Sequence, residues 1–345
     1  MLSKLDRLAY RSQHFGIAIN ATIAQEAVRI VTRMKRPEID KAMFATLDQR
    51  LKALYARDLQ NVDDGLYPKS LLFDFPLRQF ARAFPKLLRD TPRVLARMRS
   101  KNYKDIPVVD KERFPAYYRR NFHWQTDGYF SEHSAEVYEL GVELLFRGTA
   151  NVMRRQIIPP ITRFARDQGG SSGMKILDVA CGTGPTLHQL AVTHSQARLY
   201  GVDLSPAYVK TARKRLEDAP DLTLAVENAE HLPYADGWFD VVTSTYLFHE
   251  LPRNARRNVM RELFRVCRPG GLVVIQDSAQ LSESASLEAA LRGFPAEFHE
   301  PFYADYLGDD LAGMLEAVGF VDTETEAQMV AKVVTARKPG GTTLA

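Results

Sequence analysis

The sequence predicts an α/β protein in which a doubly wound, mostly parallel seven-stranded sheet follows an N-terminal helical domain. From about residue 174 onward, short apolar runs alternate with helical segments, a pattern typical of parallel sheets with helices on both faces. The first 125 or so residues show only helical periodicity. The last two strand-like runs have no helix between them, which predicts an antiparallel hairpin at one sheet edge.

The ranges of the expected elements follow from these runs. Strands are expected at 174–180, 198–203, 222–227, 239–245, 271–277 and, as a final pair, near 320–336. Helices are expected between them near 186–194, 206–217, 254–266 and 309–318.

The residues before the sheet are expected to be mainly helical, with stretches near 3–33, 40–60 and 77–101. In the second stretch, Leu47, Leu51 and Leu54 recur at spacings of three and four residues, as one buried helix face requires. A further helix is expected after Ser131, a suitable N-cap, and the Gly/Ser-rich stretch 169–173 is a linker. The chain is therefore divided into a helical N-terminal lid domain at 1–125, a helical connection at 126–170 and a sheet domain at 171–345.

Composition limits the class of protein. Of the 345 residues, 45% are hydrophobic and 26% are charged, as in ordinary globular proteins. No apolar run reaches the roughly 18–20 residues that span a bilayer, and charges near the N-terminus argue against a signal peptide. Cys181 and Cys267 lie in apolar stretches and form neither a disulfide framework nor a metal-ligand spacing. We therefore expect a cytoplasmic protein without a metal site.

The first expected strand leads into a glycine loop. The strand ends near Asp178, and Gly182 and Gly184 turn the chain into a helix. Glycines adopt positive φ and let the backbone approach a ligand that a Cβ would obstruct. A dinucleotide-binding fingerprint needs a third glycine at the position of Leu187. This difference argues against a dinucleotide-binding enzyme.

Polar side chains also stand at the ends of the next two strands. Asp203 lies about 20 residues past the loop, where an acidic residue can accept hydrogen bonds from both hydroxyls of an adenosine ribose. Ser205 and Pro206 supply the cap and first turn of the following helix, which leaves Asp203 available to a ligand. The polar cluster at 226–234 can bind the adenine edge while its apolar neighbours sandwich the ring.

Five sequence blocks resemble a known family. They read Asp-x-x-Cys-Gly-Thr-Gly, Gly-x-Asp-x-Ser, Asn-Ala-Glu-x-Leu-Pro-Tyr, Phe-Asp-Val-Val and Arg-Pro-Gly-Gly-Leu. In this order they are similar to the class I S-adenosylmethionine-dependent methyltransferases of the small-molecule type, with a methyltransferase type 11-like domain. The resemblance covers residues 174–338, about half of the chain. It is specific for fold and cofactor and unspecific for substrate.

The resemblance implies a Rossmann-like sheet with S-adenosyl-L-methionine as the methyl donor. It also implies cofactor contacts at ten positions: Asp178, Ala180, Gly182 and Gly184 in the loop region, Asp203 and Leu204 near the ribose, Asn228 and Ala229 near the adenine, and Thr245 and Tyr246 beside the methionine or the acceptor.

The acceptor side is sought beyond the fourth and fifth strands. Methyl transfer from a sulfonium requires alignment and exclusion of water, and a general base where the acceptor must lose a proton. His249 follows the fourth strand and either fixes its loop or takes part in catalysis. In the segment 294–303, aromatic residues accompany the pair His299 and Glu300. His299 is the leading candidate base, and Tyr303 belongs to the expected acceptor wall.

An opposing wall is expected from residues 121–130. His123, Trp124 and Tyr129 lie there among further aromatic and polar residues, a combination that suits a ligand pocket. An equally good interpretation is that the aromatic side chains anchor the helical domain to the sheet. The aromatic content of both walls predicts an acceptor that is small and either aromatic or lipophilic.

Positive charge is concentrated in the first half of the chain. Residues 1–150 hold 26 Lys/Arg and 18 Asp/Glu, a net charge of +8, and the remainder holds 20 and 24, a net charge of −4. The stretch 77–104 contains nine Lys/Arg and one acid. Its predicted cationic stripe consists of Arg78, Arg82, Lys86, Arg89, Arg93 and Arg97. Three interpretations are open: a solvated face, peripheral contact with an anionic membrane, or attraction of an acidic substrate.

Two alternative functions also remain open. A basic N-terminal domain is compatible with methylation of RNA or another nucleic acid. Residues 244–247, Ser-Thr-Tyr-Leu, disfavour it, because they replace the Asn/Asp-Pro-Pro-aromatic motif of enzymes that methylate exocyclic base nitrogens. The second alternative is a pseudoenzyme or interaction protein that binds the cofactor without transferring the methyl group. The intact loop and Asp203 argue against it.

Overall fold

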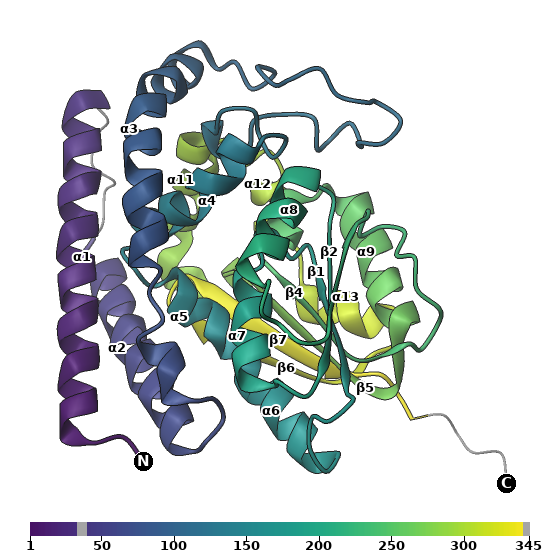
Figure 1. The fold of residues 1–345 in the computed structure, drawn as a ribbon. Coiled ribbons are helices and arrows are strands. Elements are labelled where there is room, and N and C mark those ends of the chain that lie inside the picture. The colour runs from purple at the N-terminus through teal and green to yellow at the C-terminus, as the bar shows by residue number, and fades with distance from the viewer. Residues whose placement is uncertain (33–39, 341–345) are drawn as a thin grey trace, which may run out of the picture.

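The computed structural model describes residues 1–32 and 40–340 and contains the expected seven-stranded sheet (Figure 1). Its order is β3-β2-β1-β4-β5-β7-β6, and β1 to β5 run parallel while β7 is antiparallel to both β5 and β6. The strands are β1 Lys175–Val179, β2 Arg198–Asp203, β3 Leu222–Val226, β4 Phe239–Thr245, β5 Cys267–Ser278, β6 Val321–Gln328 and β7 Ala331–Arg337. The predicted doubly wound sheet and its closing hairpin are confirmed.

The chain reverses its direction of winding between β1 and β4. From β1 it proceeds outward to β2 and β3, and it then returns to β4 on the other side of β1. The carboxyl ends of these strands therefore meet beside a crevice, which is where parallel α/β sheets bind their ligands.

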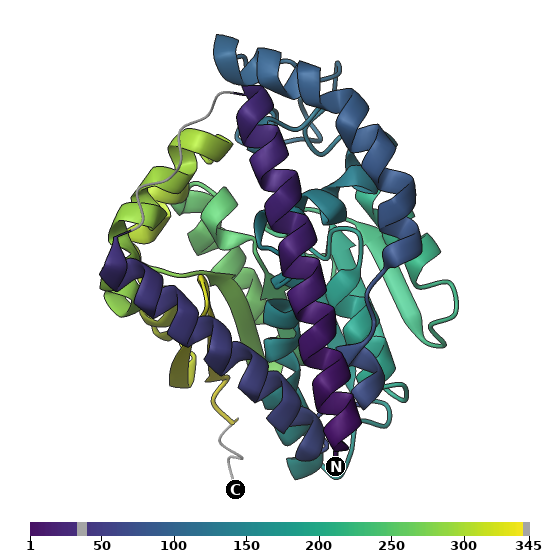
Figure 2. The ribbon, with the colours of Figure 1, turned by 90° about the vertical axis from the view of Figure 1, so that its left-hand side faces the viewer.

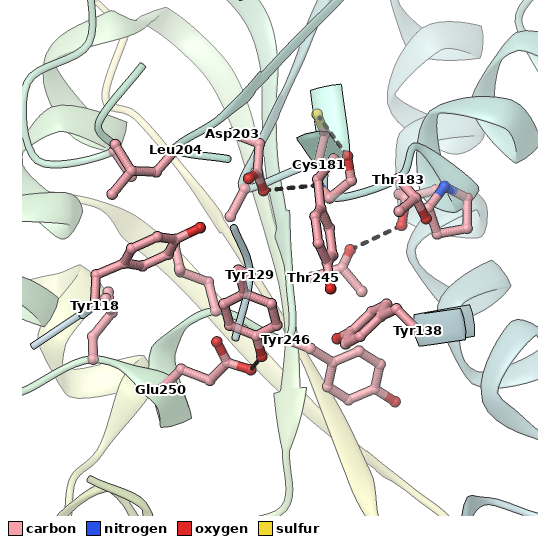
Figure 3. Close-up of a pocket in the computed structure, with 18 of the residues that line it drawn as sticks. Tyr118, Tyr129, Tyr138, Cys181, Thr183, Asp203, Leu204, Thr245, Tyr246 and Glu250 are labelled. Atoms are coloured by element: carbon pink, nitrogen blue, oxygen red, sulfur yellow. Dashed lines mark hydrogen bonds between the residues drawn. The ribbon is translucent and has the colours of Figure 1, made fainter. Parts of the chain in front are cut away.

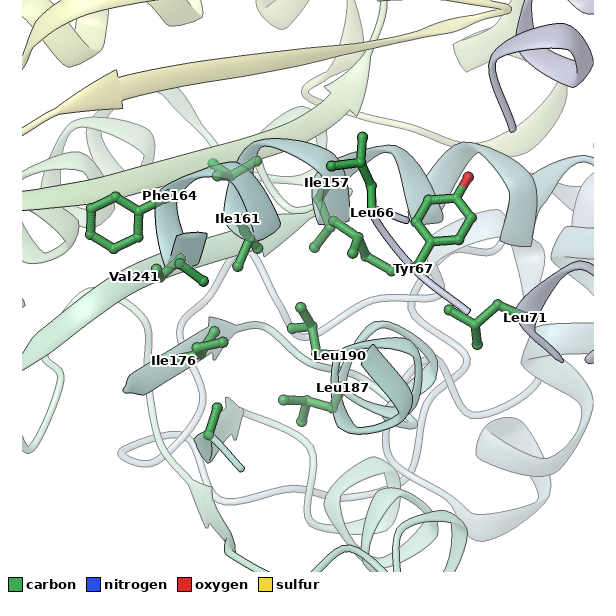
Figure 4. Packing of buried hydrophobic residues seen from close by; sticks show 14 of the residues in the cluster. Leu66, Tyr67, Leu71, Ile157, Ile161, Phe164, Ile176, Leu187, Leu190 and Val241 are labelled. Carbon is green, nitrogen blue, oxygen red and sulfur yellow. The ribbon is translucent and has the colours of Figure 1, made fainter. Parts of the chain in front are cut away.

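Two hydrophobic clusters cover opposite faces of the sheet, because successive strand residues point to opposite sides. On one face, Ile176 and Val241 pack with Leu187 of α7 and Ile161 of α6 (Figure 4). On the other, Leu177 packs in a cluster with residues of α9 and α13. The helices that flank the strands are α6 Ile158–Asp167, α7 Pro185–Thr193, α8 Pro206–Arg215, α9 Arg253–Val266 and α13 Leu311–Ala317.

The residues before the sheet are mainly helical, as predicted. These elements are α1 Lys4–Thr32, α2 Lys41–Asp63, η1 Lys69–Leu72, α3 Leu77–Ser100, η2 Phe122–Trp124, α4 Glu132–Leu145, α5 Ala150–Arg154 and η3 Arg155–Ile157. Ser131 caps α4 by accepting a hydrogen bond from the amide of Ser134. The last residue of the expected range 3–33 lies outside the described residues.

Short helices also fill the connections late in the chain. They are η4 Phe248–Glu250, α10 Leu281–Ser284, η5 Ala285–Leu287, α11 Glu288–Phe298 and α12 Tyr303–Leu307.

The N-terminal helices share a buried hydrophobic cluster with the first face of the sheet. Leu2 and Tyr10 of the N-terminal segment belong to the same buried cluster as Leu59 of α2 and Ile176 of β1. A hydrophobic core is therefore shared between the helical region and the sheet region. The domain boundaries at 125 and 170 stay a prediction.

The cationic stripe of α3 is shorter than expected. Arg78, Arg82, Arg89 and Arg93 are exposed, whereas Arg97 is only 5% exposed and donates to the backbone oxygen of Trp124 at 3.1 Å. Including Arg97 in the stripe was therefore wrong, because its guanidinium serves as an internal hydrogen-bond donor. Among the described residues, no helix has the length and apolar character needed to cross a membrane.

Candidate functional site

A cavity lies at the carboxyl ends of β1, β2 and β4, between the sheet and the helical region (Figure 3). Its lining comprises Tyr117, Tyr118, Tyr129, Tyr138, Glu139, Arg154, Ala180, Cys181, Gly182, Thr183, Pro185, Thr186, Asp203, Leu204, Tyr208, Glu227, Asn228, Ala229, Thr245, Tyr246, Leu247, Glu250, Leu251 and Val259. Of the ten expected cofactor positions, all except Asp178 and Gly184 line it.

The loop after β1 is shaped by three residues with positive φ. They are Ala180 at 61°, Gly182 at 56° and Gly184 at 81°, a region that favours glycine. Gly184 does not line the cavity but begins α7, and a Cβ there would lie 3.0 Å from the side chain of Leu216. Its glycine therefore permits close packing of α7 against the end of α8.

Asp203 joins this loop to the end of β2. Its carboxylate accepts hydrogen bonds from the amides of Gly182 at 2.9 Å and Ser205 at 2.8 Å. Burial raises the pKa of Asp203 to about 6, although the two amide donors oppose this shift. A carboxylate oxygen can accept more than one hydrogen bond, so Asp203 retains acceptor capacity toward the cavity.

Asp178 is buried below the loop and lacks hydrogen-bond partners. It is 1% exposed, and neither carboxylate oxygen accepts a hydrogen bond from the described residues. Burial, and then the neighbouring Asp203, raise the pKa of Asp178 well above its usual range. An orphaned buried carboxyl is costly. A cationic or hydrogen-bond-donating ligand group would offset that cost, so Asp178 fits the loop end of a cofactor site.

The roof of the cavity comes from the helical region, and the sequence analysis missed most of it. On α4, Tyr138 lines the cavity, and Glu139 accepts hydrogen bonds from Thr183 of the loop at 2.8 Å and from Arg154 at 3.0 Å. Burial opposes ionisation of Glu139, but Arg154 outweighs it and holds the pKa below its usual range. A signal was present, since Glu139 and Glu143 are acids one helical turn apart on a face that also carries Ala135.

Glu250 lines the cavity from η4, and the sequence analysis named only its neighbour His249. It accepts a hydrogen bond from the hydroxyl of Tyr129 at 2.6 Å, and it lies 3.3 Å from Nε2 of His123 (Figure 3 shows Glu250 and Tyr129). Tyr129 is one of the four expected acceptor residues and lines the cavity, whereas His123 is not part of the cavity lining.

His123 lies between two carboxylates. Its Nδ1 is 2.9 Å from Oε1 of Glu300, on the opposite side of the ring from Glu250. Burial disfavours the charged ring, but Glu300 and Glu250 outweigh it and raise the pKa of His123 to about 10. The ligand atoms of these three residues lie within 4.8 Å of one another, close enough for a cation. Because the carboxylates contact opposite ring nitrogens, we interpret the group as an ion-paired imidazolium.

The remaining expected acceptor and catalytic residues lie outside the cavity lining. His249 contacts Asp277 through Nδ1 at 2.6 Å, and Asp277 also accepts from the amide of Phe248. Tyr303 shares a hydrogen bond with Ser278 at 2.5 Å. These contacts connect η4 and α12 to the end of β5.

His299 stacks on Tyr103, with ring centroids 5.0 Å apart, and lies 4.8 Å from the ring of Trp124. Burial, and then the charge of Arg120, lower the pKa of His299 to about 4. The structure therefore brings Trp124 and His299 together without exposing either to the cavity. Glu300, next in the chain, is the member of this pair that reaches His123. A catalytic role for His299 stays a prediction.

The comparison with known proteins identifies the sheet region. Residues 176–271 match a family described as a methyltransferase domain. Phthiotriol/phenolphthiotriol dimycocerosates methyltransferase 1 of Mycobacterium ulcerans is 36% identical over 124 residues, which are 36% of this chain and 45% of that protein. Malonyl-[acyl-carrier protein] O-methyltransferase of Geobacter sulfurreducens is 32% identical over 158 residues, 45% of this chain and 58% of that protein.

Among solved structures, phosphoethanolamine N-methyltransferase 2 of Haemonchus contortus, in complex with S-adenosyl-L-methionine, is similar with a TM-score of 0.41 and 18% identity. The match covers 54% of this chain and 52% of that one. The chain thus spans about half the length of the curated relatives it matches.

Proposed function

We propose, from the premise that this chain belongs to the class I S-adenosylmethionine-dependent methyltransferases, that it methylates a small aromatic or lipophilic acceptor held under its helical roof. The observation that carries the proposal is that the glycine loop, Asp203, several tyrosines and Glu250 line one cavity. Such a site combines a donor half with a largely aromatic acceptor half, beside which Glu250 supplies a carboxylate.

The donor half consists of this chain's loop and strand ends. S-adenosylmethionine, when bound, supplies a sulfonium methyl group for in-line displacement. Asp203 would accept hydrogen bonds from the ribose hydroxyls, and Asn228 and Ala229 would face the adenine. Asp178 would compensate the positive charge of the methionine part. The missing hydrogen-bond partners of Asp178 support this assignment.

The acceptor half is largely aromatic. Tyr118, Tyr129 and Tyr138 extend from the helical region toward Tyr246, which follows β4 (Figure 3). Aromatic rings supply apolar area together with polar edges, so they would hold an aromatic or lipophilic molecule and exclude water. Holding the two reactants in line, rather than activating the donor, is what the protein must contribute.

Glu250 is the group we assign to proton transfer where the acceptor must lose a proton. It faces the cavity, and the Tyr129 hydroxyl fixes one of its oxygens at 2.6 Å. The His123 imidazolium, held by Glu300, would balance its negative charge. Glu250 would take the acceptor's proton as the methyl group is transferred.

Calorimetry with S-adenosylmethionine tests the donor half. Asp203→Asn removes the charge but retains the shape of the side chain. It should weaken binding about 10- to 100-fold, because hydrogen bonds to charged groups contribute about 1.5–3 kcal/mol each. Asp218→Asn is the matched control: it makes the same change at an exposed carboxylate after α8. This variant should bind the cofactor like the wild type. Equal affinities for both variants would overturn the ribose assignment.

Transfer of a labelled methyl group tests the acceptor half. Aromatic alcohols, quinols, hydroxylated lipids and RNA would be offered as separate acceptor classes. Transfer to RNA would favour the nucleic-acid alternative, and cofactor binding without transfer to any class would favour a pseudoenzyme. With a working acceptor, Glu250→Gln should lower kcat and leave cofactor affinity intact. His299→Gln is the discriminating control. A larger decrease in kcat for this variant than for Glu250→Gln would identify His299 as the general base.

A further inference from the structure

Helix α1 carries an apolar stripe on its outer face. Leu5, Leu8, Phe15, Ile19, Ile23 and Ile30 are exposed, from 43% at Ile19 to 76% at Leu5. Their spacings of three, four and seven residues align them along one side of the helix. With 29 residues, α1 is about 43 Å long. Polar residues interrupt the stripe at Ser12, which is exposed, and at Glu26, whose side chain is 39% exposed. An exposed series of large apolar side chains on one helix face is typical of an interaction site.

The stripe faces away from the protein. Tyr10, His14 and Ala21, on the opposite side of α1, are buried. Figure 2 shows α1 running across the face that is turned toward the viewer, with α2 and α3 beside it. Lys4 and Arg11 of α1 are exposed. Its two acids are partly exposed: Asp6 lies 3.5 Å from Lys69, and Glu26, whose side chain is 39% exposed, pairs with Arg29.

Helix α3 adds positive charge to the same side of the molecule. Both α1 and α3 pack on α4, and both views place them on one side (Figures 1 and 2). Within the described residues, no carboxylate forms an ion pair with Arg78, Arg82, Arg89 or Arg93, and the single acid of α3, Asp90, is buried. On another edge of α3, Leu77, Phe84 and Leu88 are exposed.

We propose that α1 and α3 form a surface that docks on a membrane containing anionic phospholipid. An acyl boundary accepts leucine, isoleucine and phenylalanine side chains, and anionic headgroups attract arginine and lysine. A second copy of this chain is the competing occupant. It would bring two basic surfaces together, which opposes self-association. The inference stands apart from methyl transfer, since it uses no residue of the cavity.

Vesicle flotation with the full chain tests the surface. The vesicles are phosphatidylcholine with about 30% phosphatidylglycerol, and pure phosphatidylcholine serves as the neutral control. Phe15→Glu with Ile19→Glu should lower partitioning by about 10-fold or more, because charge replaces two inserted side chains. Phe15→Ser with Ile19→Ser is a milder version. Val321→Glu, at an exposed apolar residue of β6, is the matched control and should float like the wild type.

The charge component has its own pair of variants. Arg82→Glu with Arg89→Glu should abolish binding at low salt, whereas Lys214→Glu on α8 should not. Thermal unfolding and cofactor calorimetry check that each variant is folded. Absence of flotation with anionic vesicles, or flotation that the stripe variants leave unchanged, would overturn the proposal. A dimer in light scattering that Phe15→Ser with Ile19→Ser dissociates, without vesicle binding, would assign the surface to a second copy.

Discussion

A buried ion pair fastens the N-terminal helix α2 to η3, in the helical connection before the sheet, and offers the sharpest stability prediction. Asp58 of α2 is fully buried and contacts Arg155 of η3 at 2.9 and 2.7 Å. The hydroxyls of Tyr10 on α1 and Tyr67 also donate to Asp58, both at 2.6 Å. Burial opposes ionisation of Asp58, but Arg155 and these donors outweigh it and hold the pKa below its usual range. Four donors from three segments therefore converge on one carboxylate.

Asp58→Ala should destabilise the protein by about 3–5 kcal/mol, because removing one partner leaves a buried charge uncompensated. The lost tyrosine hydrogen bonds, at about 1 kcal/mol each, overlap with that cost rather than adding to it. Asp48→Ala is the matched control on the same helix. Asp48 pairs with Lys52, whose side chain is 75% exposed, so its loss should cost only about 0.5 kcal/mol.

Urea unfolding followed by circular dichroism and tryptophan fluorescence measures both variants. A double replacement, Asp58→Leu with Arg155→Met, should recover most of the lost stability, since apolar residues of similar size remove both buried charges. An Asp58→Ala protein within about 1 kcal/mol of the control would refute the reasoning. It would mean that α1 and α2 unfold without loosening the sheet region, and non-coincident transitions of the two probes would reveal this.

Three further predictions concern packing and pH. Gly201→Ala should lower the free energy of unfolding, measured in urea, by about 1–3 kcal/mol. The reason is that its Cβ would lie 2.6 Å from the side chain of Leu187 and 2.7 Å from that of Leu224. An unchanged unfolding midpoint would show that these side chains can move. Cofactor affinity should fall as the pH drops below about 6, where Asp203 gains a proton. Calorimetry should find this dependence weaker in Asp203→Asn. Burial lowers the pKa of His14 from 6.5 to about 4. The unfolded chain therefore binds a proton at this residue more readily than the folded chain, so stability is unaffected above pH 6.5 and decreases as the pH falls toward 4. In His14→Phe, the decrease in the free energy of unfolding over this pH range should be smaller.

The sequence predicted the sheet region well because its signals are local. Each strand is a short apolar run, and Ser205 caps the helix that follows the second strand. Leu187 in place of a glycine distinguishes the loop from a dinucleotide site. The blocks around Asp203 and Asn228 lie directly at strand ends, so a parallel sheet brings them to one crevice whatever the rest of the chain does.

The acceptor side was harder to predict because its residues are distant in sequence. Glu250 and His123 are 127 residues apart, and Glu139 and Thr183 are 44 apart. No periodicity records such pairs; only packing of the helical region over the loop creates them. The sequence favoured His299 and not Glu250 as the base for the same reason: only the folded chain shows which of the two side chains faces the cavity.

The sequence by itself therefore determined the order of strands and helices and the loop that would bind the methyl donor, because hydrophobic periodicity and glycine positions act over a few residues. The tertiary structure decided what covers that loop. In the folded chain Arg97 is buried, and His123 lies between Glu250 and Glu300. The apolar side of α1 is exposed. These outcomes depend on which surfaces meet when distant segments pack, and burial then fixes the charges and hydrogen bonds that each side chain must satisfy.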